Sequence, residues 1–61
     1  SKILESMPNE RYRRLIVYRY LDQRSNEETA ELLSLTMSNF YNIHLRAKKQ
    51  FCDALRKEGL I

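Results

Sequence analysis

Hydrophobic positions along the chain recur with helical spacing, and strict alternation of apolar and polar residues is absent. The clearest pattern is an i, i+3, i+4 stripe that predicts an amphipathic helix continuing to about Lys57, with Gly59 as its stop. This stripe consists of Phe40, Ile43, Ala47, Phe51 and Ala54 or Leu55. Glycine and proline occur once each, so breaks between helices are few. We predict one all-α domain, a small helical bundle over residues 1–61.

A segment from Pro8 to Leu21 is apolar around most of its circumference and predicts a second helix. Proline is favourable in a first helical turn, where its missing N–H is not needed. An all-round apolar helix must be covered by neighbours, and central burial in the domain is the simpler interpretation. The alternative adds a docking face for another protein. Ile3 and Leu4 precede this helix and suggest a short leading turn or helix.

A short helix is predicted from Asn26 to Leu33, because Ser25 and Glu28 have the spacing of a capping box. We expect its inward residues to be Thr29, Leu32 and Leu33. The connection Ser34-Leu35-Thr36 follows, and either Thr36 or Ser38 is expected to cap the long helix after it.

Two helices joined by so short a connection predict a helix-turn-helix, in a winged-helix-like domain without a wing. The steep crossing of the helices needs a small residue, which Ala30 provides, and the turn needs an apolar plug, which Leu35 provides. Phe40 and Ile43 supply the inward groups of the following helix. The usual turn glycine is replaced by Ser34, which we expect to adopt a left-handed conformation at some cost.

Charge adds a candidate chemistry to this fold. The net charge is only +3, but the segment from Arg11 to Arg24 contains five arginines and only one aspartate. No acidic residue occurs from Leu32 through Cys52. Such a surface suits a polyanion. Asparagine pairs with adenine and arginine with guanine in the major groove, whereas basic groups further along suit phosphates.

The long helix presents a face opposite its apolar stripe, comprising Ser38, Asn39, Tyr41, Asn42, Leu45, Arg46 and Lys49. The predicted base-contacting residues are Ser38, Asn39, Tyr41, Asn42 and Arg46. The predicted phosphate contacts are Arg24, Ser25, Thr36, Lys48 and Lys49.

Catalysis and metal binding have little support in the sequence. His44 and Cys52 are two helical turns apart, with no further histidine or cysteine for a zinc site or a nucleophilic pair. We predict no catalytic residue, no metal and no cofactor. A single cysteine suggests a reducing compartment, and no apolar run approaches the roughly 20 residues that span a bilayer. We therefore expect a cytoplasmic protein with no membrane partner.

The order of these pieces, "MPNERYRRLIVYRYLDQRSNEETAELLSLTMSNFYNIHLRAKKQF", resembles region 4 of bacterial sigma factors, most closely the extracytoplasmic-function group. Met7-Pro8 matches the family's start, Arg19-Tyr20-Leu21 the end of its arginine-rich helix, and Arg46-Ala47-Lys48-Lys49 its closing basic run. Ser34 and the pair Gln23-Arg24 depart from the family pattern, where glycine is common.

The resemblance implies a module that binds the −35 promoter element while attached to RNA polymerase. It also implies contacts of the first helices with the flap of the polymerase β subunit or with an anti-sigma factor, for which the candidates are Leu15, Val17, Tyr18 and Leu21. The chain would then be a monomeric C-terminal fragment of a longer protein. Two alternatives stay open: the effector domain of a dimeric regulator of the response-regulator type, and a helical module that binds only protein.

Overall fold

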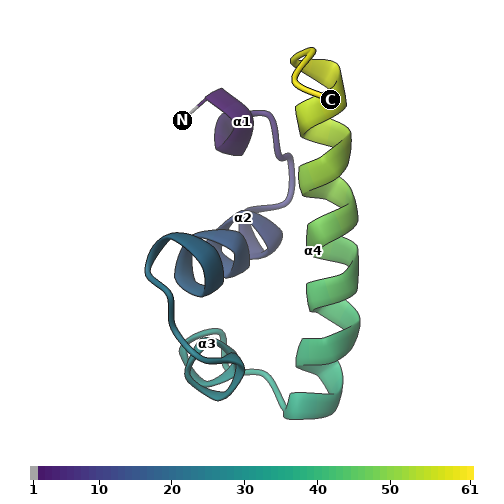
Figure 1. Ribbon diagram of the computed structural model, residues 1–61. Coiled ribbons are helices and arrows are strands. Elements are labelled where there is room, and N and C mark those ends of the chain that lie inside the picture. Colours follow the sequence, from purple (N-terminus) through teal and green to yellow (C-terminus); the bar gives the residue numbers. More distant parts are fainter. Residues whose placement is uncertain (1) are drawn as a thin grey trace.

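A computed structural model describes residues 2–61, and every regular element in this range is helical. The elements are α1 (Lys2–Glu5), α2 (Glu10–Ile16), the π-helical turn η1 (Val17–Leu21), α3 (Asn26–Leu32) and α4 (Met37–Lys57). α4 is one long rod, and α1, α2 and α3 are stacked along one side of it (Figure 1). Its 21 residues span about 32 Å, which accounts for the 33 Å long axis of the molecule. The prediction of an all-α domain is confirmed.

One apolar core lies between α4 and the shorter helices. Its buried hydrophobic residues are Met7, Leu15, Ile16, Ala30, Leu33, Phe40, Ala47 and Ala54. Phe40 is the largest side chain with no exposed surface. The fully buried Thr29 is the polar exception, and its hydroxyl donates to the Ser25 carbonyl at 2.9 Å. Burial of Ala47 and Ala54 confirms the predicted stripe, in which Leu55 is only half-buried.

The first long helix is shorter and less regular than predicted. It begins at Glu10 rather than Pro8, because the Asn9 side chain accepts a hydrogen bond from the Tyr12 N–H at 3.1 Å and caps the helix. Pro8 therefore precedes the cap. Before it, Met7 is fully buried and anchors this entry to the core, a role that the sequence pattern did not reveal.

The same helix also does not continue to Leu21 in α-helical form. From Val17 it widens to a π-helical turn, in which the Asp22 N–H donates to the Val17 carbonyl at 2.9 Å. In this turn Arg19 reaches α3, where its Nε donates to Asn26 Oδ1 at 2.6 Å. Tyr20 reaches α4. The π-turn thus ties the first helical segment to both helices of the predicted helix-turn-helix.

The predicted capping box begins α3. Ser25 Oγ accepts from the Glu28 N–H, and Glu28 Oε1 accepts from the Ser25 N–H. These hydrogen bonds to Ser25 lower the pKa of Glu28 below its ordinary value. The prediction that Leu32 points inward is wrong, since 45% of it is exposed. At 100° per residue it lies about 100° from the centre of the buried face formed by Thr29, Ala30 and Leu33.

Two non-glycine residues adopt left-handed backbone, Gln23 and Ser34, each with φ of 56°. Ser34 follows the C-cap of α3; its N–H donates to the Glu31 carbonyl and the Leu35 N–H to the Ala30 carbonyl. This is a Schellman motif, and its usual residue at that position is glycine. Gly59 has the same role after α4, with φ of 75°. The expected left-handed Ser34 is confirmed.

We expect Gln23→Gly and Ser34→Gly each to stabilise the domain by several tenths to about 1 kcal/mol. The left-handed conformation costs a residue with a Cβ about 1–2 kcal/mol, and glycine avoids this cost. Part of the gain is offset because glycine has greater conformational freedom in the unfolded chain. Urea unfolding of each variant and of the pair measures the gain. Ser38→Gly, at the exposed start of α4, is the control and should lower the stability. A loss of stability in both test variants would contradict this account of the turns.

Candidate nucleic-acid interface

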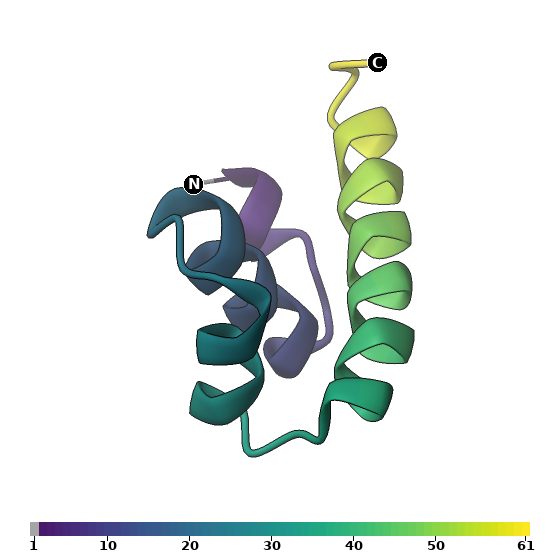
Figure 2. The ribbon, with the colours of Figure 1, turned by 60° about the horizontal axis from the view of Figure 1, so that its bottom comes forward.

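A U-shaped connection joins α3 to α4, and Figure 2 shows the chain reversing there. Ala30 and Leu33 are buried on the inner side, and the half-buried Leu35 packs against the core as the plug of the turn. Thr36 caps α4: its Oγ1 accepts from the Asn39 N–H at 3.2 Å, which decides between Thr36 and Ser38. This is the arrangement of a helix-turn-helix.

The face of α4 opposite the core is exposed along its N-terminal half. At 100° per residue from the buried Phe40, Leu45 lies at about 140°, Ser38 at about 160° and Lys49 at about 180° around the helix. Asn42 lies at about 200°, and these four residues form the centre of the exposed face. All of the residues predicted to contact bases or phosphates are exposed: Ser38, Asn39, Tyr41, Asn42, Arg46, Arg24, Ser25, Thr36, Lys48 and Lys49.

These residues do not all share one direction. Arg46 and Asn39 lie on one flank of α4, at about 240–260°. Arg46 lines a depression there with residues 8–12 and Ile43. Lys48 lies on the other flank, at about 80°, beside Tyr20. Arg46 and Lys48 therefore lie on opposite flanks of α4, whereas Asn42 and Leu45 project centrally.

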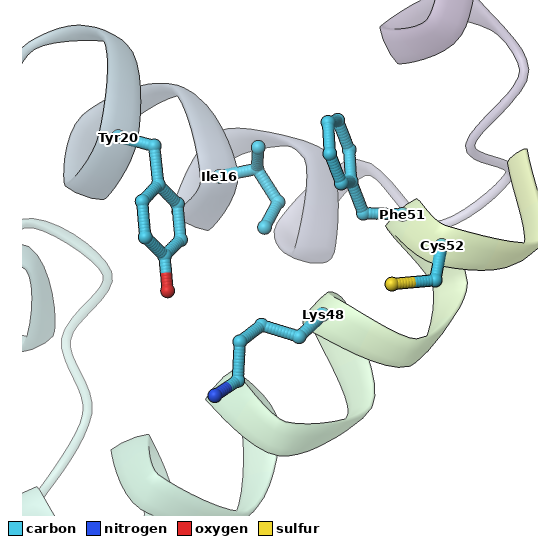
Figure 3. A pocket seen from close by; sticks show the side chains of 5 residues that line it. All are labelled: Ile16, Tyr20, Lys48, Phe51 and Cys52. Carbon is cyan, nitrogen blue, oxygen red and sulfur yellow. The ribbon is translucent and has the colours of Figure 1, made fainter. Parts of the chain in front are cut away.

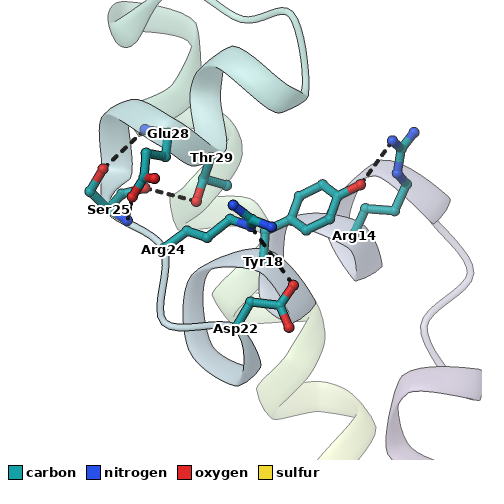
Figure 4. A network of polar contacts seen from close by, with 7 residues as sticks. All are labelled: Arg14, Tyr18, Asp22, Arg24, Ser25, Glu28 and Thr29. Atoms are coloured by element: carbon teal, nitrogen blue, oxygen red, sulfur yellow. Dashed lines mark hydrogen bonds and ion pairs between the residues drawn. The ribbon is translucent and has the colours of Figure 1, made fainter.

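Arg14 and Arg24 both contact the Tyr18 ring, and Arg24 directly precedes the cap of α3 (Figure 4). The Tyr18 ring has the Arg14 guanidinium carbon at 5.7 Å and that of Arg24 at 6.0 Å from its centroid. Arg14 also donates to the Tyr18 hydroxyl at 3.1 Å, and the Arg24 Nε lies 3.9 Å from Asp22 Oδ2. Of these two cations, only Arg24 adjoins Ser25, where phosphate contacts were predicted, and Arg14 lies beyond the Tyr18 ring.

A side-chain hydrogen bond joins α4 to η1. The Tyr20 hydroxyl and His44 Nε2 share a hydrogen bond of 2.7 Å, and the His44 ring centroid lies 5.2 Å from that of Phe40. Burial lowers the pKa of His44 below its ordinary value, with a smaller contribution from the positive charges of Lys48 and Arg19. The lowered pKa favours the neutral imidazole, which therefore bonds to Tyr20 without adding a positive charge to α4.

A profile of the protein family described as "Sigma-70, region 4" matches residues 2–51, which is most of the chain. The chain belongs to the sigma-70 region 4 family. This family supplies sigma factors with a promoter-binding, RNA-polymerase-associated domain that contains a helix-turn-helix, and it is not an enzyme family. No curated protein and no solved structure matches the chain significantly.

In this region 4 domain, a second surface lies between α1, α2, η1 and α4. An apolar groove of about 270 Å³ is lined by Ile16, Tyr20, Lys48, Phe51 and Cys52 (Figure 3). A smaller hollow of about 190 Å³ adjoins it, shares Ile16 and Phe51, and adds Ile3, Leu4 and Leu21. We call the two together the apolar groove.

The four predicted protein-contact residues differ in burial. Leu15 is fully buried in the core, so its side chain has no surface for a partner. Val17 and Tyr18 are half-buried, and Leu21 is exposed and lines the groove. Tyr20 and Phe51 also line the groove, and so does Ile16 although it is buried in the core at 3% exposure. On a helix that is apolar nearly all round, the hydrophobic pattern alone does not show that Tyr20 reaches the groove.

Two further findings limit the chemistry of the region 4 domain. Among residues 2–61, no three histidine, cysteine or acidic side chains gather as metal ligands would. Over the same range, no helix combines the length and apolarity needed to cross a bilayer.

Proposed function

We propose that this region 4 domain reads the −35 promoter element with α4 in the major groove, within a sigma factor of the extracytoplasmic-function type. The observation that carries the proposal is the outward face of α4. It lies opposite the core, begins at the turn of a helix-turn-helix and belongs to a stretch without acidic residues from Leu32 to Cys52. The major groove is wide enough to admit a helix in this way.

Base contacts are proposed for the exposed polar groups near the start of α4. Asn42 lies close to the centre of the face, where its amide can pair with adenine, and Ser38 lies one turn before it. Asn39 and Arg46 reach the groove from one flank. Tyr41 borders the face on the other side, at about 100°.

Phosphate contacts are proposed for the cations and hydroxyls around this face: Arg24, Ser25, Thr36, Lys48 and Lys49. The Ser25 and Thr36 oxygens already accept capping hydrogen bonds. A hydroxyl also has one donor, so both remain able to donate to a phosphate oxygen. These cations would position the helix while the residues assigned to base contacts read the sequence.

For the apolar groove we propose the flap of the polymerase β subunit as the occupant, with an anti-sigma factor as a competitor for the same surface. Its lining is almost entirely apolar, and Leu21 at its edge is 65% exposed. The domain would act as a monomer, because attachment to polymerase rather than dimerisation raises its local concentration at the promoter. Sedimentation of the chain tests this point, and a stable dimer would favour the response-regulator alternative.

Fluorescence anisotropy with −35-like duplexes at about 50 mM salt tests the proposal, since electrostatic binding is strong there. Lys49→Ala is expected to weaken binding uniformly across sequences and to reduce the slope of log affinity against log salt by about one. Lys57→Ala, at the far end of α4, is the matched control and should leave the slope unchanged. Binding that is insensitive to salt, or equal effects of the two variants, would refute the proposed groove contact.

A further inference from the structure

Two large apolar side chains, Tyr41 and Leu45, are exposed on the face of α4 that would enter the groove. Tyr41 is 56% exposed and Leu45 is 68% exposed. A scattered exposed hydrophobic residue needs no explanation in itself. These two are one helical turn apart, and Leu45 is set among Ser38, Asn42 and Lys49 at the centre of the face.

The position of the Tyr41 ring is restrained by the core. Its centroid lies 5.8 Å from that of the fully buried Phe40, with the rings inclined at 68° in an edge-to-face arrangement. Such a pair favours one orientation of the exposed ring. Leu45 follows four residues later, about 6 Å along the axis. That separation is slightly less than two base-pair steps of about 3.4 Å.

The major-groove edges of the bases carry one prominent apolar group, the C5-methyl of thymine. An apolar side chain at the centre of a reading face therefore has one chemically matched target. The adenine opposite that thymine presents an N6 donor and an N7 acceptor, which an asparagine amide pairs with. Asn42 lies about 60° around the helix from Leu45, so the two are neighbours that together match an A·T pair.

We propose that Tyr41 and Leu45 form a thymine-reading strip, which selects DNA with thymines within two base-pair steps of each other. The inference rests on the proposed function and names the bases that the recognition helix prefers. The cations beside the strip, Lys48 and Lys49, contact phosphates and do not discriminate among sequences. Discrimination at these positions then comes from methyl contacts and not from charge.

The test begins with selection of bound duplexes from a randomised pool by the parent chain at low salt. Each thymine of the selected site is then replaced singly by deoxyuridine, which removes only the methyl group. Removing a buried methyl contact is expected to weaken binding about fourfold at each thymine that the strip reads. In Leu45→Ala the effect of deoxyuridine should disappear at one of these thymines and persist at the other, which Tyr41 reads.

Leu60→Ala is the matched control, because Leu60 is also exposed, at 61%, but lies beyond α4. It should retain the parent's full sensitivity to deoxyuridine. Unchanged thermal unfolding of Leu45→Ala shows that its altered binding does not come from misfolding. Enriched sites that bind equally well with thymine or deoxyuridine would overturn the thymine-reading strip and leave the proposed function standing. A chain that enriches no sequence would overturn both.

Discussion

Phe40→Ala is expected to leave the domain largely unfolded at 25 °C. Phe40 has no exposed surface, and truncating a buried phenylalanine to alanine costs about 3–5 kcal/mol. A chain of 61 residues has a total stability of only about 3–9 kcal/mol. The ring also packs against the rings of Tyr41 and His44 on the same helix, so its loss removes these contacts as well. Urea unfolding followed by far-ultraviolet circular dichroism measures the loss.

Leu45→Ala is the comparison variant for this prediction, since it removes a large apolar side chain from the exposed face of the same helix. Its stability should change by no more than about 0.5 kcal/mol, as is usual for surface substitutions. Equal stabilities of the two variants would mean that the core is not centred on Phe40.

The second large effect is expected at the crossing of α3 with the rest of the domain. Ala30 is 2% exposed, and its carbonyl also accepts the Leu35 N–H in the turn at 2.8 Å. Ala30→Leu inserts extra carbon atoms where α3 approaches α4. Overpacking of this kind costs about 1–3 kcal/mol. Because α3 is short and is held by the turn, the strain should also displace α4 and weaken DNA binding.

Thermal unfolding measures the stability of this variant, and anisotropy measures its binding under conditions where it remains folded. Glu31→Leu places the same side chain at the neighbouring exposed position and serves as the control. A stable Ala30→Leu variant with the parent's affinity would show that no close helix approach occurs at this position.

Local features of the domain were accessible from the sequence because neighbouring residues determine them. Ser25 and Glu28 form the capping box, Thr36 caps α4, and Ser34 adopts the left-handed backbone required by the turn. The stripe from Phe40 to Ala54 faces the core for the same reason, since helical period alone decides it. The exposure of the predicted DNA-contacting residues follows directly from that stripe.

Features that depend on packing between elements were not accessible. The pattern from Pro8 to Leu21 did not reveal the cap at Asn9, the π-turn from Val17, or that Leu15 is core while Leu21 is exposed. On a helix that is apolar all round, only the position of the neighbouring helices separates these roles. Burial of Met7 likewise depends on contacts with residues distant in sequence.

The sequence by itself determined the helices, the turn and the outward face of α4, because spacing and capping act over a few residues. Only the tertiary structure decided which apolar residues form the groove and which form the core, because that depends on how α1, η1 and α4 lie together. It also decided that the chain widens into a π-turn at Val17, from which Arg19 bonds to α3 and Tyr20 to α4.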